Sequence, residues 1–219
     1  MNKEAVLTGA TGLVGSALLS QLLDDERFAS VKVFVRRPTG KNHPKLKEFI
    51  IDFSSPAGWR HLVKGDVLFL TLGTTKARAG SKKAQYRVDH GYQLEFASAA
   101  ASNEMDSVVL VSSAGAREGS PFFYMRMKAE VERDIRALGF ESLRIIRPGP
   151  LSGPRKEKRY GEIVGTALIK AVNQLGILRS YKPVDAGIVA KAMINAAFPG
   201  SKGVKTYELL QVFDLAGHK

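Results

Sequence analysis

The sequence predicts an α/β protein with a doubly wound parallel sheet and a small C-terminal lobe. Short apolar runs alternate with helical stretches through most of the chain, and each run is almost continuously apolar. Strands buried on both faces of a parallel sheet have this composition, and their alternation with helices is typical of βαβ units. We expect one domain over residues 1–219, made of a core (1–148) and a C-terminal lobe (149–219).

The expected strands and helices follow from these runs. Right-handed crossovers between parallel strands place a ligand at the carboxyl ends of the strands. The alternation of apolar runs and helical stretches changes after Arg147-Pro148-Gly149-Pro150. A basic loop that contains Gly and Pro spans 149–161. The predicted strands are 4–8, 31–35, 49–53, 67–72, 107–112 and 143–146, with a further short run at 204–210. The predicted helices are 13–24, 55–64, 82–102, 122–138, 161–175 and 185–197.

A glycine-rich turn joins the first predicted strand to the first predicted helix. Residues 8–15 read Thr-Gly-Ala-Thr-Gly-Leu-Val-Gly. Gly9 permits a tight turn, Gly12 lets the backbone approach a pyrophosphate, and Gly15 lets the helix pack close to the strand. Glycine turns after strands are common, so the motif alone leaves a plain turn equally open. The dinucleotide-binding hypothesis assigns Gly9, Ala10, Thr11, Gly12, Leu13, Val14 and Gly15 to the cofactor.

Arg36 and Arg37 lie just past the second predicted strand, where an NAD site usually offers a carboxylate to the ribose hydroxyls. Guanidinium groups match a phosphate, so the pair favours NADP(H) over NAD(H). The alternative is two solvated loop arginines before a proline.

Two further strand ends carry candidate cofactor contacts. Asp52 is expected to end the third strand, where its carboxylate either bonds an adenine amino group or caps the strand end. The small turn Leu72-Gly73-Thr74-Thr75 ends the fourth strand and either leaves room for a cofactor or only connects two elements.

Ser112, Ser113, Tyr124 and Lys128 form the candidate catalytic set. The serines end the fifth predicted strand, and Tyr124 and Lys128 are spaced to share one face of the next helix. A lysine ammonium beside a phenol stabilises the tyrosinate and lowers a tyrosine pKa from about 10, which allows acid/base chemistry near neutral pH. A serine hydroxyl could hold a reacting carbonyl. The Tyr-x-x-x-Lys spacing is weak evidence by itself, and its position after the fifth strand gives it weight.

The composition narrows the function classes. The chain contains no cysteine, which excludes disulfides, thiolate metal sites and a cysteine nucleophile. The four histidines lack metal-ligand spacing, and no apolar run is long enough to span a membrane. The predicted first strand begins near the first residue and leaves no room for a signal peptide, so we expect a cytoplasmic protein.

The chain carries 33 Lys and Arg against 21 Asp and Glu, a net charge of +12, which favours anionic partners. The basic residues are scattered and no nucleic-acid-binding motif accompanies them. We therefore expect a basic surface around an anion-binding pocket rather than nucleic-acid recognition.

Together these motifs resemble the short-chain dehydrogenase/reductase superfamily in its extended or atypical branch. The resemblance runs from Val6 to about Ala192 and is nearest to the Tat-interacting-protein-like subgroup. It rests on the glycine turn and five later segments. These are Leu72-Gly73-Thr74-Thr75, with Lys76, Ala79 and Gly80 following; Arg87-Val88-Asp89; Ser112 to Ala116; Tyr124 to Glu132; and Arg147-Pro148-Gly149.

The resemblance implies a Rossmann-type sheet that binds NADP(H) at its carboxyl edge. It implies that Tyr124 transfers a proton, that Lys128 bonds the nicotinamide ribose, and that Ser113, in preference to Ser112, positions a substrate carbonyl. Pro148 and Gly149 match the loop that passes the nicotinamide, and 149–161 matches the variable substrate loop. The chain departs from the pattern at Asp89, where extended members often have Asn, and this puts an Asn-based proton relay in doubt.

Two functions follow. The first is an NADPH-dependent oxidoreductase that acts on a small carbonyl compound, and retention of the whole Ser-Tyr-Lys set favours it. The second is a non-catalytic regulatory or interaction protein that uses NADP(H) as a structural or redox-sensing ligand. Members of the superfamily often dimerise, so a homodimer is a further expectation, although no hydrophobic stripe in the sequence marks an interface.

Overall fold

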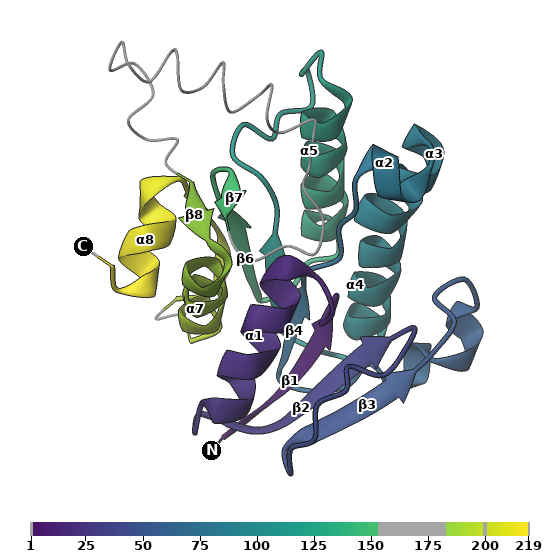
Figure 1. The fold of residues 1–219 in the computed structure, drawn as a ribbon, viewed down its shortest axis with the longest axis vertical. Coiled ribbons are helices and arrows are strands. Elements are labelled where there is room, and N and C mark those ends of the chain that lie inside the picture. The colour runs from purple at the N-terminus through teal and green to yellow at the C-terminus, as the bar shows by residue number, and fades with distance from the viewer. Residues whose placement is uncertain (1, 153–182, 199–200, 219) are drawn as a thin grey trace.

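The structure is a computed structural model that describes residues 2–152, 183–198 and 201–218. Its centre is a parallel sheet of seven strands in the order β3-β2-β1-β4-β5-β6-β9 (Figure 1). This order reverses direction at β1 and β4, as in a doubly wound fold, so the expected fold class is confirmed. The strands are β1 (Lys3–Thr8), β2 (Phe28–Val35), β3 (Leu46–Ile50), β4 (Val67–Leu70), β5 (Ser107–Val111), β6 (Ser142–Arg147) and β9 (Gly203–Glu208).

Helices cover both faces of the sheet (Figure 1). One layer contains α1 and α7, and the other contains α4 and α5. The helices are α1 (Leu13–Asp24), α2 (Lys76–Ala79), α3 (Lys82–Tyr86), α4 (Gln93–Ser102), α5 (Phe123–Arg136), α7 (Ala186–Ala196) and α8 (Leu210–Ala216). A π-helical segment, η3 (Arg87–Tyr92), lies between α3 and α4.

The central strands explain the apolar runs of the sequence. Successive side chains of a strand point to opposite faces. On β1, Ala5 and Leu7 pack in the core under α1 and α7, whereas Val6 packs in the core under α4. All three are fully buried, so a strand covered on both faces needs apolar residues at every position.

Three predicted elements differ from the structure. The third strand is β3, at 46–50 rather than 49–53, because β3 is an edge strand that is only partly buried and lacks a continuous apolar run. Residues 55–64 contain two short 3-10 turns, η1 (Pro56–Gly58) and η2 (Arg60–Leu62), instead of one helix. The helix expected at 82–102 is helical over that whole range, but its middle part, η3, is π-helical and contains Asp89.

The C-terminal segment contributes to the main sheet. β9 pairs in parallel with β6, and α7 packs against α1. A small second sheet joins β7 (Leu151–Ser152) to β8 (Val184–Asp185). The predicted helix at 161–175 and most of the loop 149–161 lie outside the described residues, and the boundary of the C-terminal lobe stays a prediction.

Candidate functional site

The glycine turn lies at the carboxyl edge of the sheet, between β1 and α1. Gly9 has a φ of +80°, a conformation that residues with a Cβ rarely adopt. A Cβ on Gly15 would lie 2.0 Å from the Gly9 carbonyl oxygen, so α1 begins in direct contact with the turn. Any larger residue at these two positions would push the helix away from the strand.

The start of α1 suits a phosphate. Gly12 is the N-cap residue and has no side chain to cap the helix. The first N–H groups of a helix have no acceptor within the helix, so those of Leu13, Val14 and Gly15 are available to an anion. The turn therefore fits a dinucleotide, because it allows a close approach to the backbone and presents a helix N-terminus without a side-chain cap.

Thr71 supports this turn from the neighbouring strand, and the sequence analysis missed it. Its hydroxyl donates to the Thr8 carbonyl over 2.6 Å. The same hydroxyl would lie 2.6 Å from a Cβ on Gly9 and 2.6 Å from a Cβ on Gly15. A small polar residue after an apolar strand was the signal available in the sequence.

Arg36 and Arg37 directly follow β2 and are exposed. Neither guanidinium forms an ion pair with any residue in the described part of the chain. These two adjacent guanidinium groups at the carboxyl edge offer donors that match a phosphate group.

Asp52 lies beside this loop, since the Ile51 N–H donates to the Val35 carbonyl over 2.9 Å. The expectation that Asp52 ends the third strand is wrong, because β3 ends at Ile50. Its carboxylate accepts hydrogen bonds from the backbone N–H and the hydroxyl of Ser54, at 2.8 and 2.7 Å. These bonds lower the pKa of Asp52 and show that part of its bonding capacity is already used in a local turn.

The turn at 72–75 is attached to a buried carboxylate. The Thr74 N–H donates to Oδ2 of Asp89 over 2.8 Å, and Gln85 donates to the Thr74 carbonyl over 3.3 Å. A Cβ on Gly73 would lie 3.3 Å from Oδ1 of Asp89. The turn is therefore held against η3, while the Thr75 hydroxyl caps the short helix α2.

Tyr124 and Lys128 share one face of α5, as the spacing predicts. The Lys128 Nζ atom lies 5.8 Å from the centre of the Tyr124 ring. Tyr124 is 38% exposed, whereas Lys128 is 3% exposed and lies 3.3 Å from Oδ1 of Asp89. Burial by itself lowers the pKa of Lys128, but the charges of Asp89 and Tyr124 outweigh it, and the pKa is raised. The structure thus brings together a reachable phenol and a buried, charged ammonium.

The two serines have different partners. The Ser112 hydroxyl is buried and bonds to the carboxylate of Glu132. Ser113 is half-buried, and the one hydrogen bond of its hydroxyl within the described residues is a long contact of 3.4 Å with the Ala114 carbonyl. Ser113 therefore keeps more bonding capacity than Ser112.

Glu132 is a second residue that the sequence analysis left without a role. It is 2% exposed and accepts two hydrogen bonds from Arg147, at 2.9 and 2.6 Å. Arg147 also lies 3.5 Å from Glu208 at the end of β9, and Glu208 accepts from the Gly115 N–H over 2.8 Å. This network fixes the backbone that follows Ser113.

Pro148 and Gly149 directly follow β6 at the same edge. The Pro148 carbonyl accepts from the Ala114 N–H over 3.0 Å, which joins this loop to the loop after β5. The pair therefore lies next to the segment that carries Ser113.

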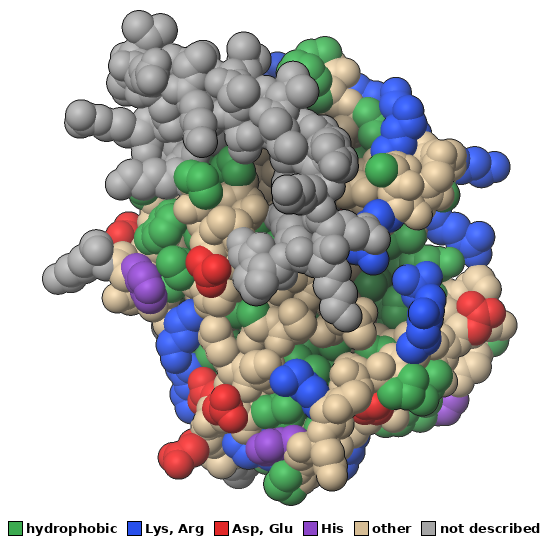
Figure 2. Space-filling model, in the orientation of Figure 1, with side chains coloured by type: hydrophobic (Ala, Val, Ile, Leu, Met, Phe, Trp, Pro, Cys, Tyr) green, Lys and Arg blue, Asp and Glu red, His purple; other side chains and the backbone are tan. Residues whose placement is uncertain are grey.

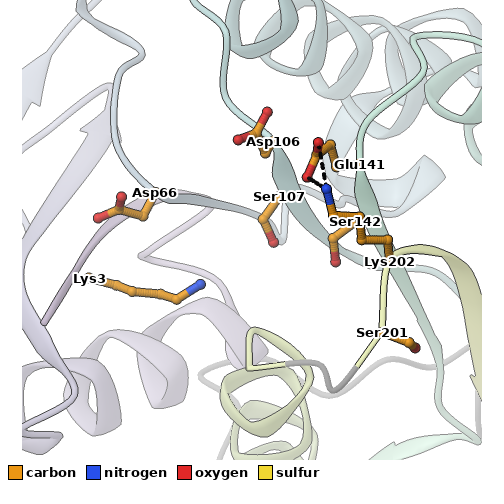
Figure 3. Close-up of a pocket in the computed structure, with 8 residues that line it drawn as sticks. All are labelled: Lys3, Asp66, Asp106, Ser107, Glu141, Ser142, Ser201 and Lys202. Atoms are coloured by element: carbon orange, nitrogen blue, oxygen red, sulfur yellow. Dashed lines mark hydrogen bonds and ion pairs between the residues drawn. The ribbon is translucent and has the colours of Figure 1, made fainter. Parts of the chain in front are cut away.

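A cavity of about 480 Å³ lies away from this site, at the amino ends of the strands (Figure 3). Ser107, Ser142 and the ion pair of Lys202 with Glu141 contribute to its lining. The hydroxyl oxygens of both serines are buried and have no hydrogen-bond partner among the described residues, so neither is paired with a base that could activate it.

The described part of the chain lacks a cluster of metal-ligating side chains and a membrane-spanning helix. No group of three or more His, Asp or Glu residues there could hold a metal ion. On the face drawn in Figure 2, Lys and Arg side chains lie in several separate groups. Among the described residues, no helix is both long and apolar enough to cross a membrane.

Comparisons with known proteins agree with this geometry. A sequence model of a family described as NAD(P)H-binding matches residues 9–172. Protein fmp52, mitochondrial, of Aspergillus fumigatus is 37% identical over 205 residues, with 90% of this chain and 88% of the relative covered. Protein FMP52, mitochondrial, of Candida albicans is 34% identical over 203 residues, which cover 90% and 89% of the two chains.

Solved structures share the fold at low sequence identity. WbmH of Bordetella bronchiseptica, solved with NAD+, is 18% identical with a TM-score of 0.72, covering 95% of this chain and 76% of that chain. MoeE5, solved with UDP-glucose and NAD, is also 18% identical, with a TM-score of 0.69 and coverage of 98% and 81%.

The names of the relatives contradict one expectation. The sequence analysis expects a cytoplasmic protein, but the fmp52 relatives are named as mitochondrial. The expectation is wrong because it considered only a secretory signal peptide, which does not distinguish the cytoplasm from mitochondria.

Proposed function

Because the chain belongs to the NAD(P)H-binding family, within the atypical short-chain dehydrogenase/reductase superfamily, we propose that it is an NADP(H)-dependent oxidoreductase. Its substrate is a small carbonyl compound, and Tyr124 is the acid/base. The observation that carries the proposal is the pairing of a reachable Tyr124 with a buried Lys128 on α5, at the edge that also holds the glycine turn.

The cofactor has matching groups along this edge. The turn from Gly9 to Gly15 holds the pyrophosphate through backbone N–H groups, and Arg36 and Arg37 hold the phosphate that distinguishes NADP(H). Leu72 to Thr75, Pro148 and Gly149 line the path toward the reacting centre. Asp52 contributes at the adenine end, where Ser54 already shares its carboxylate.

The chain's own side chains handle the proton and the carbonyl oxygen. When bound, the nicotinamide ring supplies the hydride. Tyr124 donates its phenolic proton to the carbonyl oxygen, and Ser113 donates a hydrogen bond that stabilises the charge developing there. Lys128 stabilises the phenolate that remains and bonds the nicotinamide ribose. Ser112 supports the loop through Glu132 and does not contact the substrate.

The test is NADPH oxidation by the purified protein with a panel of aliphatic and aromatic aldehydes and ketones. Tyr124→Phe removes the proton donor, so we expect turnover to fall by about a hundredfold or more, the range of general acid catalysis. NADPH binding, followed by fluorescence titration, should change little.

Tyr207→Phe on β9 is the matched control, because Tyr207 packs against the core under α1 and α7, on the sheet face opposite α5, and its substitution should leave turnover unchanged. Equal turnover of wild type and Tyr124→Phe contradicts the assignment of the acid. NADPH binding with no turnover of any substrate favours instead a non-catalytic, redox-sensing protein.

A further inference from the structure

Asp89 connects two parts of the proposed site. It is 1% exposed and lies in η3, between the turn after β4 and helix α5. Its Oδ2 atom accepts the Thr74 N–H over 2.8 Å, and its Oδ1 atom lies 3.3 Å from the Lys128 Nζ atom. The Gln93 side chain donates to its backbone carbonyl over 2.7 Å, which holds η3 against α4.

Lys128 depends on this carboxylate. An ammonium group that is taken out of water costs several kcal/mol unless a charged partner compensates it. Within the described part of the chain, Asp89 is the one carboxylate in ion-pair contact with Lys128. The other titratable groups that face Lys128 are Tyr124 and Glu132, both on α5, and the Glu132 carboxylate is already held by Arg147.

We propose that Asp89 is a positioning residue for the reaction: its carboxylate keeps Lys128 charged and directed at Tyr124, in a dry ion pair fixed to the turn after β4. This inference rests on the proposed function. The Lys128 ammonium group lies near both the Tyr124 ring, at 5.8 Å, and the carboxylate that balances its charge, at 3.3 Å.

The substitution Asp89→Asn removes the negative charge of the carboxylate and nearly preserves the shape of the side chain. The Asn oxygen can still accept the Thr74 N–H, so the turn keeps its hydrogen bond while Lys128 loses its partner. A buried ammonium without a partner gives up its proton at lower pH. The charged form of Lys128, which the reaction needs, is therefore confined to lower pH.

The measurement is the pH profile of kcat/KM for NADPH-dependent reduction. We expect the basic limb of the profile to move down by about one pH unit or more in Asp89→Asn, the size of effect that an opposite charge at this distance produces. Activity on the acid side should recover toward that of wild type. A loss of activity by the same factor at every pH would indicate a merely structural role and overturn the proposal.

Asp134→Asn is the matched control. Asp134 lies 2.7 Å from Nε2 of His90 and so forms a hydrogen bond between η3 and α5, without contacting Lys128. Its substitution should leave the basic limb in place. An equal shift in both variants would mean that loosening η3, not the charge of Asp89, moves the profile.

A second measurement does not need activity. Urea unfolding of wild type, Asp89→Asn, Lys128→Met and the double variant gives the coupling between the two side chains. We expect Asp89→Asn to change the unfolding equilibrium constant about tenfold less in the Lys128→Met background. Additive effects would overturn the pairing. Absence of turnover in the wild type would count against the proposed function, whereas this cycle would still decide whether Asp89 holds Lys128.

Discussion

Ser112 and Ser113 are neighbours in the chain, but their hydroxyl groups have different surroundings. Ser112 bonds to a buried carboxylate, whereas among the described residues Ser113 has only a long contact with a carbonyl. The arginines differ in the same way: Arg27 bonds to both oxygens of Asp25, whereas Arg36 and Arg37 form no ion pair with the described residues. At the scale of single residues, the free hydrogen-bonding capacity that Ser113, Arg36 and Arg37 keep among the described residues makes them candidates for ligand contacts.

Replacing both Arg36 and Arg37 by Ala tests this at the cofactor phosphate. Hydrogen bonds to a charged group contribute about 1.5–3 kcal/mol. We therefore expect the Kd for NADPH to rise about tenfold or more, and the Kd for NADH to change little, in parallel fluorescence titrations. Arg60→Ala, on the partly exposed pair with Glu95, is the control. An equal loss of affinity for both nucleotides would contradict the assignment of these arginines to the extra phosphate.

At the scale of elements, one buried carboxylate joins several parts of the site. Glu132 on α5 contacts Ser112 after β5 and Arg147 at the end of β6, and Arg147 reaches Glu208 at the end of β9. These contacts thus hold helix α5 and the ends of three strands together near Ser113. The loop geometry of the site depends on this network as much as on the sheet.

Glu132→Gln removes one charge from the network and leaves the Arg147 guanidinium with a weaker partner. Breaking a buried ion pair costs about 3–5 kcal/mol. We expect urea unfolding to show a loss near the lower end of this range, since Glu208 still lies 3.5 Å from Arg147.

Glu118→Gln is the control for that variant, because Glu118 forms an exposed pair with Arg133 at 3.8 Å. Exposed pairs contribute about 1 kcal/mol or less. Equal stability losses in the two variants would show that Glu132 acts as an ordinary surface charge.

At the scale of the whole molecule, the excess of basic residues makes the carboxylates important for stability. Lys32 lowers the pKa of Glu4, Arg27 lowers the pKa of Asp25, and Arg133 lowers the pKa of Asp134. A carboxyl group whose pKa is lower in the folded state stabilises that state above its ordinary pKa. Protonation at acid pH removes these attractions while the net charge of +12 becomes still more positive.

We therefore expect stability to be constant near neutral pH and to fall as the pH drops below the ordinary values, 4.5 for Glu4 and 3.8 for Asp25. Urea midpoints measured between about pH 3 and 7 check this. A variant with Glu4→Gln and Asp25→Asn should have a shallower acid slope than wild type. A wild-type midpoint that does not change with acid pH would contradict the role of these ion pairs.

Local rules predicted the central strands and the glycine turn, because their evidence lies within a few adjacent residues. The buried strands are continuous apolar runs, and the turn needs glycine for its backbone geometry. The same rules failed for β3, where one side of an edge strand has no neighbour, and for the segment 55–64, where Pro56 and Gly58 limit the helix to short turns.

By itself, the sequence determined the fold class, the glycine turn, the two arginines after β2 and the shared face of Tyr124 and Lys128. The fold class follows from the alternation of apolar and helical segments along the chain. Each of the other three features follows from the residues of one element or turn. Only the tertiary structure decided that the Ser112 hydroxyl bonds to Glu132, that the Thr71 hydroxyl supports the glycine turn and that Asp89 forms an ion pair with Lys128. These contacts join residues far apart in the chain, and a buried charge selects its partner by distance in the folded core, which spacing along the chain does not encode.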